Sequence, residues 1–216
     1  MTPQQVEEVA RNRFNAVNDN FYSQDEIFRI IYNGELELCQ DALVFETTDT
    51  SITTVAGTRT YSLPTRFLAV KRIEYNGLKL EKTDFRDDDR LTLDNSVTTT
   101  QGTPQYYQLF DDTLYLRPIP DAAQTVRIYG YKEPVLLTTA SVALSIPTRF
   151  HMDLVTYVSI FMAAKDKDYE GVQLYQSLWE QAKARARAWQ RKRQRTDSFA
   201  AVKDEESMGQ TIIGTV

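Results

Sequence analysis

The feature that most constrains the fold of this chain is a change of hydrophobic period along its sequence. Before Thr47 and again after Pro147, apolar residues recur three and four positions apart, as on one face of a helix. Between these regions, short runs rich in Thr, Val and Tyr are separated by frequent turn signals. The sequence therefore predicts an α+β fold. We expect a helical bundle from the N- and C-terminal helices, an inserted antiparallel β domain and an extended C-terminal tail.

The change of period divides the chain into four parts. Residues 1–48 and 148–195 form the two parts of the helical core, residues 49–147 form the β domain, and residues 196–216 form a C-terminal docking tail. The tail lacks periodicity and contains Gly, Ser and acidic residues, so we expect it to be disordered on its own. Its apolar, β-branched end is typical of a segment that adds to a partner, and the candidate contact residues there are Thr211, Ile212 and Ile213.

Local signals predict where the first two helices begin. Thr2 with Gln5 and Ser23 with Glu26 each have the spacing of a capping box. Gly34 lies inside the second predicted helix, where glycine costs about 1 kcal/mol relative to alanine. This glycine indicates either close packing or a break, and the sequence does not distinguish the two. In the final helix, burial of the apolar stripe is expected to end near Trp189.

Three two-residue turns predict β-hairpins: Ala56-Gly57, Asn76-Gly77 and Asp111-Asp112. Asn76-Gly77 is the strongest of these signals, because both residues tolerate the positive φ angles that such a turn requires. All connections between the predicted strands are short, so we expect every strand pair to be antiparallel.

The composition excludes several classes of active site. The 216 residues include one Cys, Cys39, and one His, His151, so a disulfide framework and a multi-histidine metal site are both excluded. No phosphate-binding glycine loop is present. We expect no enzyme activity, no catalytic residue, no metal and no cofactor. His151 is expected at a surface or an interface, and Asp87-Asp88-Asp89 in a solvated loop.

The same sequence argues against membrane association. No apolar run approaches the ~20 residues needed to span a bilayer. The first residues are polar and acidic rather than typical of a signal peptide. We therefore expect synthesis in the cytoplasm and no membrane partner.

The charge is unevenly distributed. The net charge is −5, from 25 Lys and Arg against 30 Asp and Glu. Seven basic residues without an intervening acid lie near the end of the final predicted helix, and removing them leaves 18 positive against 30 negative, or −12. A helix dipole favours cations at this end, but seven exceed what it requires. These seven are the remaining candidate partner-contact residues: Lys183, Arg185, Arg187, Arg191, Lys192, Arg193 and Arg195.

The order of the parts and several spaced motifs resemble the head-to-tail adaptor (connector, neck) proteins of tailed bacteriophages, most closely the podophage tail tubular protein A type. The resemblance covers roughly residues 20 to 190. Its motifs are Tyr61-Ser-Leu-Pro64 with the Asn76-Gly77 turn, Gly102-Thr-Pro-Gln-Tyr106, Leu114-Tyr-Leu-Arg-Pro118 and Ile146-Pro147. They form a spaced pattern rather than a catalytic signature.

The resemblance implies a structural protein of the virion neck or tail. Such adaptors form a ring, commonly of twelve copies, that joins the portal to a downstream tail or nozzle protein and extends the DNA channel. DNA would pass through the lumen without sequence-specific binding. The C-terminal segment of related adaptors reaches the portal, so we expect Thr196–Val216 to dock there. The alternative is a nucleic-acid-binding module acting through the basic helix end, residues 183–195.

Overall fold

The chain forms two compact units. The computed structural model describes residues 1–17, 21–64, 66–84, 86, 100–137 and 142–206, with side chains described as far as residue 194. The helical unit consists of Met1–Val44 and Pro134–Val216, and the β unit consists of Phe45–Glu133. The fold is α+β, as predicted, and most of the described strand pairs are antiparallel. The observed β unit spans residues 45–133, whereas the sequence suggested residues 49–147.

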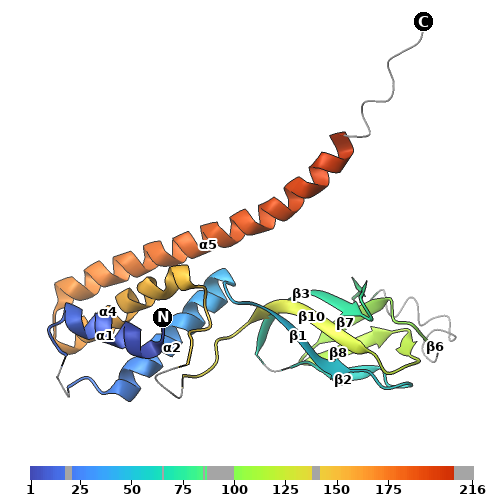
Figure 1. The fold of residues 1–216 in the computed structure, drawn as a ribbon, viewed down its shortest axis with the longest axis horizontal. Coiled ribbons are helices and arrows are strands. Elements are labelled where there is room, and N and C mark those ends of the chain that lie inside the picture. Colours follow the sequence, from blue (N-terminus) through green and yellow to red (C-terminus); the bar gives the residue numbers. More distant parts are fainter. Residues whose placement is uncertain (18–20, 65, 85, 87–99, 138–141, 207–216) are drawn as a thin grey trace, which may run out of the picture. The chain divides into compact units, whose positions relative to one another are not determined.

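Four α-helices are described in the helical unit (Figure 1). They are α1 (Pro3–Arg13), α2 (Gln24–Ala42), α4 (His151–Lys165) and α5 (Tyr169–Glu206), and the short 3-10 helix η1 (Thr148–Phe150) precedes α4. The helix α5 continues to Glu206, beyond the end at residue 195 that the sequence predicted. The part of the expected tail from 196 to 206 is therefore helical, and residues 207–216 lie outside the described part of the chain.

The two predicted capping boxes have different outcomes. At the start of α1, the Thr2 hydroxyl accepts a hydrogen bond from the Gln5 backbone, and the Gln5 side chain accepts one from the Thr2 backbone, which confirms the first box. At the start of α2, the Ser23 hydroxyl caps the Glu26 backbone N–H at 3.3 Å. The Glu26 carboxylate instead accepts a hydrogen bond from Lys165, 2.7 Å away on α4.

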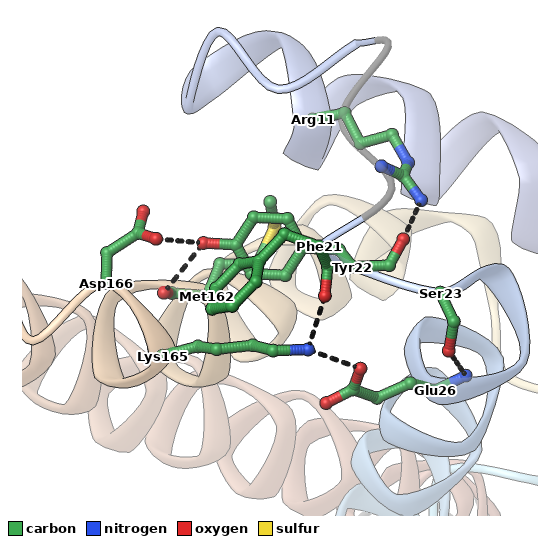
Figure 2. Close-up of polar contacts among 8 residues, drawn as sticks. All are labelled: Arg11, Phe21, Tyr22, Ser23, Glu26, Met162, Lys165 and Asp166. Atoms are coloured by element: carbon green, nitrogen blue, oxygen red, sulfur yellow. Dashed lines mark hydrogen bonds and ion pairs between the residues drawn. The ribbon is translucent and has the colours of Figure 1, made fainter.

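A polar cluster ties the start of α2 to the end of α4 (Figure 2). The Tyr22 hydroxyl donates a hydrogen bond to the Asp166 carboxylate, and Arg11 donates one to the Tyr22 carbonyl. Lys165 joins the same cluster through its ion pair with Glu26. These bonds connect α1, α4 and the segment between α1 and α2, so they fix how the first two helices meet α4.

The interior of the helical unit is built around α4, which packs against α1, α2 and α5. Its fully buried side chains come from all four helices: Val6 and Ala10, Ile27, Ile31 and Leu38, Leu154 and Val158, and Ala182 and Ala186. Of the apolar stripe predicted for α5, Ala182 and Ala186 are buried as expected, whereas Trp179 is buried in place of Leu178. Leu178 is 39% exposed and Trp179 is 3% exposed, because the Trp179 ring packs on Tyr157 with 4.7 Å between centroids.

Gly34 marks a close helix contact rather than a break. The helix α2 runs through it without interruption, and Gly34 is buried. A Cβ atom at this position would lie 2.8 Å from Cδ1 of Tyr157 and 3.1 Å from Cδ2 of Leu154, both on α4. The absence of a side chain therefore lets α2 approach α4 at this point.

The strands of the β unit form two larger sheets and one short pair. The first sheet has the order β1-β10-β3-β4 and the second β2-β8-β7-β5, while β6 pairs with β9. Their bounds are β1 (Glu46–Thr53), β2 (Thr60–Ser62), β3 (Phe67–Tyr75), β4 (Leu78–Lys79), β5 (Glu81–Lys82), β6 (Gln101–Gly102), β7 (Tyr106–Phe110), β8 (Thr113–Arg117), β9 (Ile119–Pro120) and β10 (Thr125–Lys132).

The two larger sheets share one hydrophobic core. The first sheet contributes Ile73 and Ile128, both fully buried, and the second contributes Leu114 and Leu116. The first and last strands of the unit are hydrogen-bonded neighbours, with Glu46 opposite Tyr131. The chain therefore enters and leaves the β unit at adjacent positions.

Two of the three predicted hairpins are confirmed. Asn76 and Gly77, with φ angles of 48° and 78°, join β3 to the antiparallel β4. Asp111, with a φ angle of 51°, lies in the turn between β7 and β8. The hairpin at Ala56-Gly57 is wrong: β1 pairs with β10 and β2 pairs with β8, so the strands on either side of this turn belong to different sheets.

The expectation that every pair is antiparallel is also wrong. The pairs β5–β7 and β6–β9 are parallel, each through two residues. Parallel strands need a long connection between them. The pairs Glu81↔Tyr106 and Gln101↔Ile119 are far enough apart in the chain to allow this.

A buried carboxylate joins α2 to the segment that returns from the β unit. Oε1 of Glu35 accepts hydrogen bonds from the backbone N–H groups of Ser145 at 2.7 Å and Ile146 at 3.2 Å. Glu35 is fully buried, and its Oε2 atom has no hydrogen-bond partner among the described residues. Burial raises the pKa of Glu35 to about 7, although the two backbone hydrogen bonds oppose this shift.

His151 is part of the same region, and the expectation of a surface or interface histidine is wrong. It is buried at the start of α4. The Met1 amino group donates a hydrogen bond to Nδ1 at 2.7 Å, so Nε2 carries the ring proton and donates to the Ile146 carbonyl at 2.9 Å. Burial lowers the pKa of His151, and the bond to Ile146 opposes that shift. The imidazole thus has a packing and hydrogen-bonding role.

We predict that Gly34→Ala destabilises the protein. The new methyl group would overlap Tyr157, and overpacking of this kind costs about 1–3 kcal/mol, more than the roughly 1 kcal/mol that alanine gains in helix propensity. Asn33→Ala, at the neighbouring exposed position of α2, is the control and should be neutral or stabilising. Urea unfolding of both variants measures the difference. Equal stabilities for the two would contradict the close contact.

We also predict a pH dependence of stability that Glu35 causes. Because its pKa is near 7 in the folded protein and 4.5 in the unfolded chain, the folded state binds more protons between these values. The free energy of unfolding therefore falls as the pH rises from about 4.5 to about 7, by about 3 kcal/mol from this group.

The control is Glu35→Gln, which cannot titrate and retains an acceptor for the Ser145 and Ile146 N–H groups. Comparing its urea unfolding with that of the wild type across this pH range cancels contributions from other groups, including His151. A difference between the two proteins that does not change with pH would contradict the buried carboxylate.

Candidate interaction surface

The basic segment of α5 is partly neutralised by acids of the same chain. Nζ of Lys183 lies 2.8 Å from Oε1 of Glu37 on α2 and 2.7 Å from Oε1 of Glu180 on α5. Partial burial opposes the charged form of Lys183, but the hydrogen bonds to Glu180 and Glu37 raise its pKa. Lys183 therefore helps to hold α5 on α2.

Two arginines of the segment also bind neighbouring helices. Arg187 forms a bidentate pair with Asp41 at the end of α2, with both N–O distances at 2.6 Å. Arg185 lies 2.7 Å from Asp153 on α4. Burial raises the pKa of Asp153, and Arg185 opposes this shift. Three of the seven candidate residues thus stabilise contacts within the helical unit, which their sequence positions did not reveal.

The next turn of α5 carries an aromatic and cationic cluster. The guanidinium carbons of Arg149 and Arg193 lie 4.9 Å and 4.8 Å from the centroid of the Trp189 ring. Phe150 meets the same ring edge-on at 5.5 Å. Stacking of this kind holds a guanidinium group over the face of the aromatic ring. Of the candidate set, Arg193 belongs to this cluster.

Beyond this cluster the described side chains of α5 are exposed. Gln190 is the last buried one, close to the predicted end of burial at Trp189. Arg191, Lys192 and Arg193 follow it on the exposed part of the helix. The side chain of Arg195, and the whole of Thr211, Ile212 and Ile213, lie outside the described residues.

A groove between α4 and α5 is the second surface feature of the helical unit. It has a volume of about 390 Å³, and its lining residues are Tyr157, Ile160, Phe161, Gln176, Ser177, Trp179 and Glu180. Phe161 is 41% exposed. Nε1 of Trp179 is buried and has no hydrogen-bond partner in the described part of the chain. The groove therefore combines an aromatic and aliphatic part with the polar side chains of Gln176, Ser177 and Glu180.

Neither the groove nor the Trp189 cluster was predicted from the sequence. Trp179 was missed because the predicted stripe followed Leu178, one position away. Arg149 was missed because it lies far from the basic segment in sequence, and only the packing of η1 against α5 brings it to Trp189. A Trp and an Arg four positions apart, Trp189 and Arg193, were the available signal for the cluster.

The described residues contain no candidate metal site. No group of three or more His, Cys, Asp or Glu side chains in that part of the chain is placed to hold a metal ion. Asp87, Asp88 and Asp89, expected in a solvated loop, lie outside it. Cys39 is buried in α2 as a free thiol.

Comparison with known proteins gives a family match over most of the chain. The family model described as SU10 adaptor protein matches residues 1–203 and so extends over both units. No curated protein matches the chain. In the part of the chain that the structure describes, no helix has the length and apolar character to span a membrane.

We predict that Lys183→Gln lowers stability and that Arg191→Gln does not. Both changes remove one positive charge from α5, but only Lys183 bridges to α2 through Glu37. The loss for Lys183→Gln is expected to be up to about 1 kcal/mol and to shrink at high salt. Urea unfolding at low and high ionic strength measures both effects. Equal behaviour of the two variants would show that the ion pair does not hold the helices together.

Proposed function

We propose that this chain, which belongs to the SU10 adaptor protein family, is a structural adaptor of a phage virion. The match over residues 1–203 is the observation that carries this proposal, because it includes the helices and the β unit together. The match agrees with the adaptor class that the sequence motifs resemble, and it does not distinguish the tail tubular protein A type. A structural role of this kind requires neither a catalytic residue nor a cofactor.

More specifically, we propose that copies of the chain form a ring that joins the portal of the head to a downstream tail or nozzle protein. The adaptors that the sequence resembles commonly form rings of twelve copies. A ring requires a heterologous interface, in which one face of each copy meets a different face of its neighbour. The helical unit has distinct faces of this kind: the groove between α4 and α5, and the Arg149–Trp189–Arg193 cluster. The ring would extend the DNA channel.

The charge distribution favours protein partners over DNA. Lys183, Arg185 and Arg187 are paired with acids of the same chain, so the basic segment presents fewer open charges than its sequence suggested. The alternative function, a nucleic-acid-binding module acting through residues 183–195, loses support for this reason. A channel that DNA must traverse also benefits from a wall that does not bind phosphates tightly.

We predict that the purified chain assembles on portal rings of the same phage. Negative-stain images of the mixture should show a second ring stacked on the portal, and its rotational symmetry gives the number of copies. Portal rings imaged alone are the control. Mixtures that contain only unmodified portal rings would contradict the adaptor function, and salt-sensitive binding of duplex DNA by the isolated chain would favour the alternative.

A further inference from the structure

We propose that Arg149, Trp189 and Arg193 form a docking site for an acidic surface of the portal. The inference rests on the proposed function and deepens it, because it names the residues and the chemistry of one contact between the adaptor and the portal. The site is supported by open charge, by a preformed geometry and by its position at the end of the helical core.

The open charge belongs to Arg149. Asp153 is already paired with Arg185 at 2.7 Å, and Asp41 is already paired with Arg187. Arg149, by contrast, is exposed and forms no ion pair with any residue that the structure describes. Its positive charge is therefore available to a partner, whereas the charges of Arg185 and Arg187 are used within the chain.

The preformed geometry comes from Trp189, which holds two guanidinium groups in place. The guanidinium carbons of Arg149 and Arg193 lie 4.9 Å and 4.8 Å from the centroid of its ring. Phe150 packs edge-on against the same ring and so restrains it. A free arginine side chain loses rotamer entropy when it binds, and stacking reduces that loss because the side chain is already held.

A guanidinium group held in this way suits a carboxylate. Its N–H groups lie in one plane and can donate two parallel hydrogen bonds to the two oxygens of an Asp or Glu side chain. Both Arg149 and Arg193 are exposed, so a partner can approach them from solvent. Duplex DNA is a poorer match, because it binds through several open cations, and three of the seven basic residues of the segment are paired within the chain.

The position of the cluster favours the portal as the partner. The helix α5 is uninterrupted from Tyr169 to Glu206, and Gln190 is the last buried side chain that the structure describes on it. The cluster therefore lies where α5 leaves the core of its own helical unit. It directly precedes residues 196–216, which are expected to dock on the portal, so one partner can meet both. This assigns the cluster to the portal contact rather than to the contact between copies.

Binding of full-length variants to immobilised portal rings tests the proposal. Arg149→Gln removes the charge and retains a polar side chain. We expect this variant to bind portal about fivefold or more weakly than the wild type, because a charge-assisted hydrogen bond is lost. The difference should shrink at high salt, since salt screens the attraction in the wild type. Biolayer interferometry at low and high ionic strength measures both effects.

Two further variants are the controls. Arg29→Gln removes the same charge from an exposed position of α2 outside the cluster, and it should bind portal as the wild type does. Arg149→Lys keeps the charge but loses the planar group that stacks on Trp189, so its affinity should lie between those of the wild type and Arg149→Gln. Urea unfolding of each variant separates a loss of binding from a loss of stability.

The outcomes separate the docking site from the proposed function. If Arg149→Gln and Arg149→Lys both bind portal rings like the wild type, the docking site is wrong while the adaptor function stands. An equal loss in Arg149→Gln and Arg29→Gln would show that only net charge matters, and it would also overturn the site. A wild-type chain that does not bind portal contradicts the adaptor function itself.

Two other partners are distinguished by the same variants. If Arg149→Gln weakens binding of duplex DNA and leaves portal binding unchanged, the cluster binds phosphates and the proposal is overturned. If Arg149→Gln prevents copies from associating in the absence of portal, the partner is a second copy of this chain, and the proposal is again overturned.

Discussion

The packing of the helical unit depends on the buried carboxylate of Glu35. Its two backbone hydrogen bonds hold Ser145 and Ile146 against α2, at the point where the chain returns from the β unit. The Ile146 carbonyl then binds His151, the first residue of α4. The segment anchored by Glu35 therefore connects α2 to the start of α4, against which α5 packs.

The features that were predicted correctly from the sequence are local ones, which depend on residues close together in the chain. The α1 capping box and the Asn76-Gly77 turn depend on a few adjacent positions, and the structure has both. The hairpin at Ala56-Gly57 failed because strand partners are chosen by the core of the whole unit: β1 lies beside β10, the last strand. His151 failed for the same reason, since distant parts of the chain bury it and supply its hydrogen bonds.

The basic segment of α5 also shows that contacts between distant residues could not be predicted from the sequence. The sequence identified the basic segment, but it could not show that Glu37, Asp41 and Asp153 on other helices neutralise part of it. A sum of charges along the sequence treats every charge as free, whereas in the fold these charges are paired with residues 32 or 146 positions away. The other surface features of the described helical unit are the exposed end of α5, the Trp189 cluster and the groove between α4 and α5. No sequence motif predicted the groove.

The antiparallel pairing of Glu46 with Tyr131 has a further consequence. Because the two ends of the β unit are hydrogen-bonded neighbours, its connection to the rest of the chain is a single narrow point made of two strands. A domain of different size or topology can occupy the same place if its own termini are adjacent. Residues 45–133 therefore meet the geometric condition for exchange as a module in engineering.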